Sequence, residues 1–592
     1  MCGIVGYIGK EKCIPKIISG LESLEYRGYD SAGIAYLKND EIEIKKEQGR
    51  IANLKETINL DEESYLGIGH TRWATHGKPC KENSHPHRVG KVTLVHNGII
   101  ENYDKLKKEL TEYNFQSETD SEVVAAFIDK ELKNKDILNI LKDLNKTLIG
   151  SYALGIIIDG DKNLYCIRKD SPLIIGIAED GNYIASDVPA ILRYTNKYYL
   201  LLNDEYAVLN ENEVKIFSNG KETKKELQVF SSSIDSAMKN GYEHFMLKEI
   251  FEQPKVLMDT INEFINDKEY FTKELAGLEK YDAIDIIGCG SAYHVGLVGK
   301  NLIEKYGKIP VYVDIASEYR YTEHFYQKNH LIILISQSGE TADTLAVLRK
   351  CKEMGLTTLA IVNVVGSSIA READKVIYIK AGPEIAVATT KAYSCQLIIL
   401  SLIAYYLGLH KNTLTEKDIE VYKDLGAKVD KMLESIEDTK EVAKAIYQSE
   451  DIFFLGRKID YTLCLEASLK LKEISYIHSE AYAAGELKHG TISLIDDKTP
   501  VISIITDEDI KLKTLSNTKE VCARGAKSII ISSEEVTDKD IYDMLIKVPK
   551  NHDLINPLFV IIKCQLISYY VAKLRGCDID KPRNLAKSVT VE

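Results

Sequence analysis

Cys2 is the residue with the clearest chemical potential, because it directly follows the initiator Met1. Methionine is normally trimmed before so small a side chain, which would leave a thiol and a free α-amino group on one residue. An α-amine titrates near ~8 and a thiol near ~8.5, so the amine can take the thiol proton at neutral pH without a dedicated histidine. The position predicts a self-contained nucleophile and base, although an ordinary N-terminal cysteine would look the same.

Two distant segments carry groups that such a nucleophile needs. Segment 70–77 reads HTRWATHG, and His96-Asn97-Gly98 ends an apolar-alternating stretch that begins at Lys91. A thiolate that attacks a carboxamide needs donors aimed at the oxygen that becomes negative, and an Asn side chain plus a Gly backbone N–H supply two. The other interpretation of Asn-Gly after a strand is a tight turn.

A third pattern lies in a helical segment of the C-terminal half. Glu466, Lys470 and Glu473 are spaced by four and three residues, so all three can lie on one helix face. A lysine between two carboxylates would tune their proton affinities, which suits acid and base chemistry. A solvated salt-bridge face is the commoner meaning of this spacing.

A strand followed by a hydroxyl-rich loop supplies a fourth pattern. Residues 331–335 are continuously apolar, and 336–341 read SQSGET before a helix that Gly355 ends. Hydroxyls and free N–H groups at a helix N-terminus form a phosphate cradle, whereas a plain Ser/Gly cap has the same composition. The loop lacks the Gly-Lys-Ser/Thr of a P-loop, so a nucleoside triphosphate is not implied. The helix places these apolar residues on one face: Ala342, Leu345, Leu348, Cys351 and Met354.

Composition limits the class of protein that positions these groups. The chain has 592 residues, enough for three or four domains, and a formal net charge of −13 without any Lys/Arg block, so nucleic acid is not an expected partner. Eleven cysteines are scattered singly, which predicts reduced thiols in the cytoplasm. His85-Pro86-His87 is the only close histidine pair, and no metal site is predicted there.

Neither a signal peptide nor a membrane span is expected. No leader precedes Cys2. The longest apolar run, 397–409, falls short of the ~20 residues that a span needs, so it predicts a buried helix.

The stretch 218–240 is polar and rich in turn residues, which predicts a linker. The sequence that follows it contains an internal repeat. Residues 284–288 (IDIIG) resemble 452–456 (IFFLG), and 395–398 recur as 564–567 (CQLI), at nearly the same offset. Chance coincidence is the alternative. Apolar runs that alternate with helical periodicity predict two doubly wound parallel-sheet domains, at 241–420 and 440–580.

The N-terminal motifs, together with 26–33 (YRGYDSAG) and 119–122 (TDSE), resemble class II (N-terminal nucleophile, Ntn) glutamine amidotransferases. The resemblance implies an Ntn glutaminase αββα sandwich over 2–217, with Cys2 as nucleophile and Asn97 and Gly98 as the oxyanion hole. A guanidinium suits the glutamine α-carboxylate and a carboxylate its α-ammonium. The implied glutamine-binding residues are Arg72, Trp73, Thr75, His76, Gly98 and Asp120.

Segment 288–293 (GCGSAY) follows a predicted strand but fails the dinucleotide pattern G-x-G-x-x-G because Tyr293 replaces the last glycine. With the hydroxyl-rich loop and the duplication, it resembles sugar isomerase (SIS) domains that bind phosphosugars. The implied sugar-phosphate contacts are Ser291, Ser336, Gln337, Ser338, Thr341, Val387 and Glu473.

From end to end, the chain resembles the glutamine:fructose-6-phosphate aminotransferase family, also called glucosamine-6-phosphate synthases. The resemblance implies L-glutamine and fructose 6-phosphate as substrates, an internal ammonia channel, no cofactor, and a homodimer in which His489 reaches a neighbouring subunit's site. His489 would open the sugar ring, Lys587 in an active-site tail at 581–592 would form a Schiff base, and Glu473 would shuttle the proton. The implied supporting and channel residues are Arg27, Trp73, Glu466, Lys470 and Ala586.

Two departures and two alternatives qualify this prediction. Ser291-Ala292 stands where the family usually has Thr-Ser, and Thr491 where it has proline. Another class II amidotransferase would need a diphosphate-binding acidic motif or a Ser-Gly-Gly pyrophosphatase loop, and neither occurs. A non-catalytic phosphosugar-binding regulator is opposed by intact reactive residues: Cys2, Glu473, His489 and Lys587.

Overall fold

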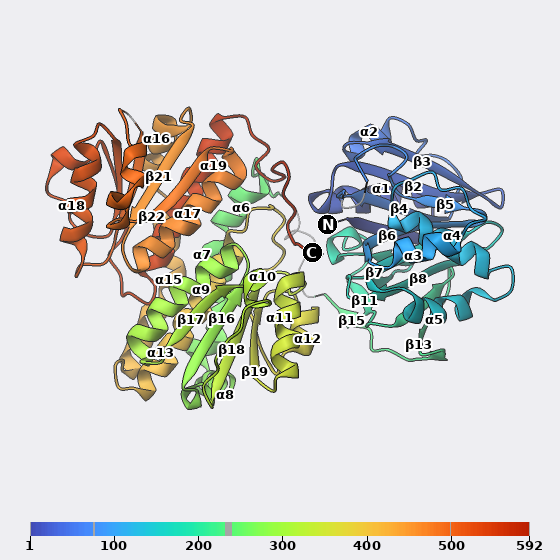
Figure 1. Ribbon diagram of the computed structural model, residues 1–592, viewed down its shortest axis with the longest axis horizontal. Coiled ribbons are helices and arrows are strands. Elements are labelled where there is room, and N and C mark those ends of the chain that lie inside the picture. Colours follow the sequence, from blue (N-terminus) through green and yellow to red (C-terminus); the bar gives the residue numbers. More distant parts are fainter. Residues whose placement is uncertain (1, 75–76, 231–238, 498, 591–592) are drawn as a thin grey trace. The chain divides into compact units, whose positions relative to one another are not determined.

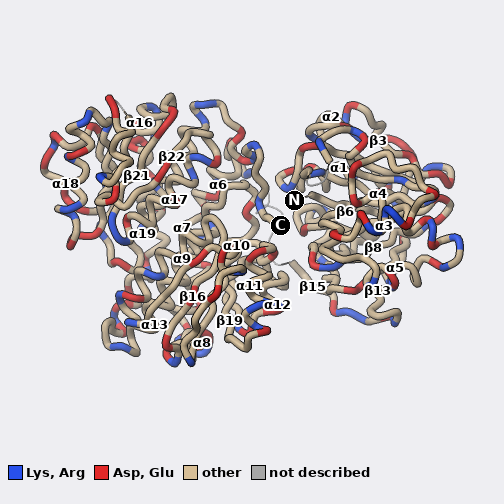
Figure 2. Tube along the Cα trace, in the orientation of Figure 1, with Lys and Arg blue, Asp and Glu red and all other residues tan. Residues whose placement is uncertain are grey.

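The computed structural model describes residues 2–74, 77–230, 239–497 and 499–590, in two compact units. The first unit comprises residues 1–237 together with 586–592, and the second comprises residues 238–585. The predicted tail 581–592 is therefore divided, because it leaves the second unit after Leu585. Lys and Arg alternate with Asp and Glu along both units (Figure 2).

The first unit is built on two sheets in which every strand pairs antiparallel with its neighbours. One sheet has the order β15 (Gln228–Val229), β11 (Lys197–Leu200), β9 (Ile174–Ile177), β10 (Gly181–Ala185), β1 (Gly3–Gly9), β4 (Leu66–Arg72), β2 (Ser31–Lys38) and β3 (Glu41–Gln48). The other has the order β14 (Lys221–Glu222), β13 (Val214–Ser218), β12 (Glu205–Leu209), β8 (Leu164–Lys169), β7 (Gly150–Ile158), β6 (Val92–Ile100) and β5 (His87–Val89).

Alternation of side chains along β6 shows how the layers form. Val95 joins an apolar cluster shared by strands of both sheets, whereas the preceding Leu94 joins the cluster formed with the helices α3, α4 and α5. Successive strand residues point to opposite faces, so one face of this sheet packs on the other sheet and one on helices. The predicted αββα sandwich is confirmed (Figure 1). Its helices are α1 (Cys13–Leu24), α2 (Ile51–Lys55), α3 (Tyr103–Glu109), α4 (Asp120–Glu131) and α5 (Ile137–Thr147).

The stretch 218–240, predicted as a linker, contains two short strands. β14 pairs with β13, and β15 pairs with β11, so both extend the sheets of the first unit. The polar, turn-rich composition concealed them because both are exposed edge strands of two residues each.

The second unit contains two parallel five-stranded sheets with the same strand order. The first copy has the order β17 (Val311–Ile315), β16 (Ala283–Gly288), β18 (His330–Ser336), β19 (Thr357–Val362) and β20 (Lys375–Tyr378). The second has the order β22 (His478–Ala483), β21 (Asp451–Gly456), β23 (Pro500–Ile505), β24 (Lys527–Ser532) and β25 (Met544–Lys547). The predicted duplication is therefore present in the topology as well as in the sequence.

Helices cover both faces of each sheet, which explains why the strands read as continuous apolar runs. In β18, Ile333 belongs to one buried cluster and the adjacent Leu334 to another. The first copy has helices α6 (Phe245–Phe251), α7 (Gln253–Asn266), α8 (Lys268–Leu275), α9 (Ser291–Leu302), α10 (Ala316–Tyr319), α11 (Ala342–Glu353), α12 (Ser368–Glu372) and α13 (Lys391–His410). Then follow α14 (Glu420–Lys423), α15 (Leu425–Leu433), α16 (Glu437–Ile446), α17 (Ile459–Ser475), α18 (Lys511–Cys522) and α19 (Asn556–Leu574).

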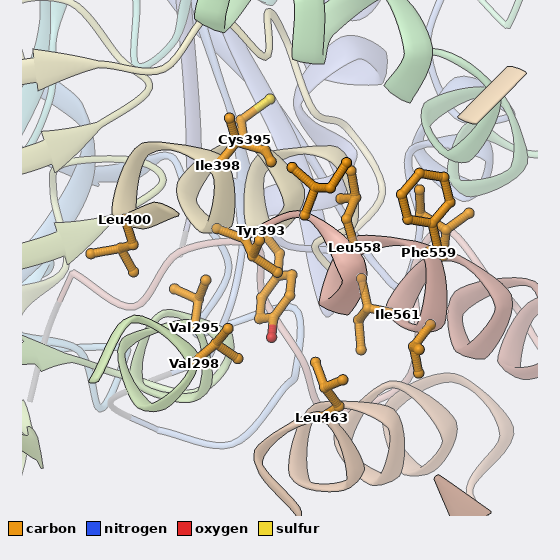
Figure 3. Packing of buried hydrophobic residues seen from close by; sticks show 14 of the residues in the cluster. Val295, Val298, Tyr393, Cys395, Ile398, Leu400, Leu463, Leu558, Phe559 and Ile561 are labelled. Atoms are coloured by element: carbon orange, nitrogen blue, oxygen red, sulfur yellow. The ribbon is translucent and has the colours of Figure 1, made fainter. Parts of the chain in front are cut away.

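The long helices α13 and α19 form the core that joins the two copies. Both are long and apolar enough to cross a membrane by length and composition, but 94% and 83% of their most apolar windows are buried inside the structure. Figure 3 shows Tyr393 and Leu400 of α13, Leu558 of α19 and Leu463 of α17 in one packed cluster. The prediction of a buried helix at 397–409 is confirmed.

Candidate active sites

Strand register brings Cys2 to the motif that contains Arg72 and Trp73. Gly3 of β1 pairs with Thr71 of β4, so the residue before β1 lies beside the residues that end β4. The Trp73 backbone N–H donates to the Cys2 Sγ over 3.3 Å. Burial raises the pKa of the Cys2 thiol, while this N–H and the charge of Arg72 act to lower it.

The predicted oxyanion donors lie on β6. Asn97 is 2% exposed, and its Nδ2 donates to the Cys2 carbonyl oxygen over 2.9 Å. Gly98 has a φ of +131°, and a Cβ there would lie 2.0 Å from the Ser151 carbonyl oxygen, so only glycine fits. β6 continues to Ile100, which rules out the tight turn that Asn-Gly also suggested.

Opposite charges flank this site. Asp120 begins α4, is 4% exposed, and accepts the backbone N–H of Ile100 over 2.8 Å. Arg72 is also buried and donates to the carbonyl oxygens of Gly77 (3.0 Å) and Lys78 (3.3 Å). Burial lowers the pKa of Arg72, whereas the nearby Cys2, Asp30 and Asp120 act to raise it, so a guanidinium and two carboxylates share the neighbourhood of the thiol.

Two residues of segment 26–33 contact the predicted glutamine-binding motif at 70–77. The Asp30 carboxylate accepts the Ala74 backbone N–H over 2.9 Å, and Tyr29 packs edge-on against Trp73. Arg27 is buried and pairs with Asp187 over 2.8 Å. The predicted glutamine contacts Thr75 and His76 lie outside the described residues.

Four buried histidines behind β6 are a feature that sequence reasoning missed. The rings of His70 and His85 lie 4.1 Å apart, and those of His85 and His87 lie 4.6 Å apart. Ser121 Oγ lies 2.9 Å from ring nitrogens of both His85 and His96. Burial lowers the pKa of His70 to about 3 and those of His85 and His87 well below the ordinary value, so these three rings are uncharged near neutrality. Among the described residues, no group has the arrangement of a metal site.

The predicted triad on α17, made of Glu466, Lys470 and Glu473, is largely buried and does not form a solvated face. Lys470 Nζ lies 2.6 Å from Glu473 and 3.5 Å from Glu466. The side chains of Lys470 and Glu466 are 1% exposed, whereas that of Glu473 is 18% exposed. Burial acts to lower the pKa of Lys470, but the two carboxylates outweigh it and raise the pKa. Lys470 therefore stays an ammonium and is unsuited to imine formation, and Glu473 is the carboxylate with room for a ligand.

Ser291 and His294 of α9 contact this triad. Ser291 Oγ donates to Glu466 over 2.8 Å, and His294 Nδ1 lies 2.9 Å from the other carboxylate oxygen. The hydroxyl of Ser291, predicted as a sugar contact, is therefore engaged by protein. Sequence reasoning missed His294, because 172 residues separate it from its partner.

The predicted phosphate loop joins β18 to α11. Ser336 Oγ accepts the Gly339 N–H over 3.0 Å and lies 2.9 Å from Thr341 Oγ1. Gly339 has a φ of +65°, and a Cβ there would lie 2.0 Å from Ser367 Oγ. The loop thus gathers hydroxyls at the N-terminus of α11, as an anion site requires. It also carries Gln337 and Ser338.

Strand order places this loop at the same sheet edge as Ser291, which contacts Glu466 of the triad. β17 lies on one side of β16 and β18 on the other, so the connections that follow β16 and β18 run to opposite sides of the sheet. In parallel sheets of this kind, ligands usually bind in the crevice that forms at the carboxyl ends of these two strands. Ser291 follows β16 at that same edge. Met354, predicted on the buried face of α11, is 52% exposed because α11 ends at Glu353.

The remaining predicted residues lie on loops and the tail. Val387 is buried, and its N–H donates to Asp580 over 3.0 Å. His489 is exposed on a short 3₁₀ helix, Glu486–His489. Ala586 and Lys587 are half-buried and belong to the first unit.

Comparisons with known proteins agree with this architecture. Residues 277–406 and 445–575 match the SIS domain family, and residues 70–193 match the glutamine amidotransferase domain family. Enzymes named glutamine–fructose-6-phosphate aminotransferase [isomerizing] from Clostridium tetani and Clostridium acetobutylicum are 50% and 48% identical over the full length of both chains.

A solved structure is similar to the second unit. It is the C-terminal domain of glucosamine-fructose-6-phosphate aminotransferase from Francisella tularensis, with a TM-score of 0.55 and 40% identity over 58% of this chain and 99% of that one. Full-length identity of this degree shows that the chain belongs to the glutamine–fructose-6-phosphate aminotransferase (isomerizing) family.

Proposed function

We propose that this enzyme converts fructose 6-phosphate and L-glutamine to glucosamine 6-phosphate and L-glutamate, the first step of hexosamine synthesis. The observation that carries the proposal is the coexistence, in one chain, of a buried Cys2–Asn97 pair and a buried Glu466–Lys470–Glu473 triad. Full-length relatives named for this reaction support it.

In the first unit, the Cys2 thiolate attacks the glutamine amide carbonyl. Asn97 Nδ2 and the Gly98 N–H face the oxyanion, while Arg72 and Asp120 bind the α-carboxylate and the α-ammonium. The tetrahedral adduct collapses to a thioester as its C–N bond breaks and ammonia leaves, and water then hydrolyses the thioester to glutamate and the free Cys2 thiol. Three of the four residues around Cys2 are buried, namely Arg72, Asn97 and Asp120, which limits the access of water to the reacting amide.

In the second unit, the loop 336–341 holds the sugar phosphate and Glu473 moves the proton between C1 and C2. His489 assists ring opening, and Lys587, which the C-terminal tail supplies, forms the imine with the ketone. The raised pKa of Lys470 supports the assignment of the imine to Lys587, because a lysine that stays an ammonium cannot form an imine. The exposure of His489 in this chain is compatible with a role in a neighbouring subunit of a homodimer.

The two reactions must be coupled, because free ammonia in water at pH 7 is almost entirely ammonium and not nucleophilic. We infer an enclosed channel with Trp73 as its gate and with Arg27 and Ala586 along the route. Glutamine hydrolysis should then be weak without fructose 6-phosphate and rise when it binds. Trp73 is the sole tryptophan, so its fluorescence should respond to the same ligand.

The assignment to the cytoplasm rests on the cysteines. All eleven are free thiols, as expected for a reducing compartment.

Incubation of the purified chain with glutamine and fructose 6-phosphate tests the proposal. Glucosamine 6-phosphate and glutamate should form in equal amounts. Glutamate without an amino sugar would indicate another class II amidotransferase, and binding without turnover would indicate a regulator.

A further inference from the structure

Glu466 receives hydrogen bonds from a helix of the other copy. Ser291 Oγ donates to Oε1 over 2.8 Å, and His294 Nδ1 lies 2.9 Å from Oε2, both from α9. Lys470 of α17 lies 3.5 Å from Oε1. The carboxylate is thus saturated on both oxygens and sealed from solvent.

The helices that carry these groups are fixed by apolar packing. Figure 3 shows the ring of Tyr393, on α13, directed toward Val295 and Val298 of α9 and Leu463 of α17. His294 directly precedes Val295, so its ring position is set by this contact and by Glu466. Pairing with a carboxylate places the imidazole hydrogen on Nδ1.

We propose that His294 is a positioning residue of the sugar site, which clamps Glu466 so that Lys470 is presented to Glu473. The inference rests on the proposed function. Without the clamp, Glu466 would lose one donor in a buried position and turn toward Lys470, because a buried carboxylate seeks a replacement hydrogen bond. Lys470 would then be drawn away from Glu473.

Three variants test the role. His294→Ala removes the donor to Glu466, and His294→Asn keeps an N–H donor. His478→Asn is the control, because His478 also pairs with a carboxylate, Asp451 over 2.6 Å, but at the opposite, amino-terminal edge of the second copy's sheet.

For His294→Ala, kcat of amino sugar formation should fall at least about tenfold, with KM for fructose 6-phosphate within about threefold of the parent. For His294→Asn, which keeps a donor to Glu466, kcat should stay within about threefold of the parent. His478→Asn should match the parent in both kcat and KM. Thermal unfolding midpoints check that all three variants fold.

The proposal is overturned if His294→Ala retains the parent kcat, or if His294→Asn loses as much kcat as His294→Ala. If His294→Ala does not fold, His294→Val, which also lacks a donor, takes its place. Failure of the proposed function is recognised separately, because the parent enzyme itself would then make no amino sugar.

Discussion

Asn97 and Cys2, 95 residues apart in the chain, are joined by a hydrogen bond of 2.9 Å from the amide Nδ2 to the backbone carbonyl oxygen. The bond orients the side chain that we assign to the oxyanion. Asn97→Ala should lower kcat of glutamine hydrolysis about 10²- to 10³-fold, the usual cost of one oxyanion donor, with little change in KM. A coupled glutamate assay measures it, and a loss below fivefold would remove Asn97 from the oxyanion hole.

Arg72 is assigned to the α-carboxylate of glutamine because its planar guanidinium can make two parallel bonds. Arg72→Lys keeps the charge but loses this geometry. We expect KM for glutamine to rise at least about tenfold, which corresponds to about 1.4 kcal/mol, with fructose 6-phosphate affinity unchanged. An unchanged KM for glutamine would place the carboxylate elsewhere.

Lys458 adopts a backbone conformation that side chains rarely tolerate. Its φ of 49° and ψ of −124° nearly equal the 55° and −124° of Gly290, the corresponding residue before α9 in the first copy. Lys458→Gly should raise the free energy of unfolding by about 1 kcal/mol. The relief of backbone strain in the folded state outweighs the conformational entropy that glycine adds to the unfolded chain. Lys472→Gly, inside α17, should lower it by a similar amount in chemical denaturation. Destabilisation by Lys458→Gly would show that the residue is not strained.

The buried histidines predict acid sensitivity of the first unit. Burial lowers the pKa of His70 to about 3 and those of His85 and His87 well below the ordinary value, so the folded state binds fewer protons than the unfolded state below pH 6.5. Their stabilisation is complete above pH 6.5 and is lost as pH falls, by up to about 1.4 kcal/mol per pH unit for each histidine.

Trp73 fluorescence during denaturation between pH 7.5 and 4.5 can follow this loss, since Trp73 belongs to the first unit. His87→Gln should make the slope shallower, and the exposed His478→Gln should not. Equal slopes for the parent and His87→Gln would contradict the prediction.

The second copy should not bind phosphosugar. The loop after β23 carries Asp507, Glu508 and Asp509 where the loop after β18 carries hydroxyls. Negative charge repels a phosphate, so calorimetry should give one fructose 6-phosphate per chain. Two equivalent sites per chain would be incompatible with this asymmetry.

Much of the fold follows from local pattern. The apolar run 331–335 became β18, and the run 397–409 lies within α13, because buried parallel strands and core helices need continuous apolar side chains. The spacing of Glu466, Lys470 and Glu473 located the triad, but only packing shows that Lys470 is buried. β14 and β15 could not be predicted, because two exposed residues carry no periodicity.

Non-local pairing accounts for the parts of the site that the sequence did not reveal. His294 meets Glu466 because α9 packs on α17, and no local signal links residues so far apart. The histidine cluster behind β6 arises in the same way from separate segments.

The origin of the transferred nitrogen tests the account most directly. Glutamine labelled with ¹⁵N in its amide is supplied with fructose 6-phosphate and an excess of unlabelled ammonium, and the glucosamine 6-phosphate is analysed by mass spectrometry. We predict that the product carries ¹⁵N undiluted by the ammonium, and that Cys2→Ala forms no labelled product. Unlabelled product from the parent enzyme, or labelled product from Cys2→Ala, would contradict the claim that the glutamine nitrogen is released at Cys2 and reaches the sugar through an enclosed path.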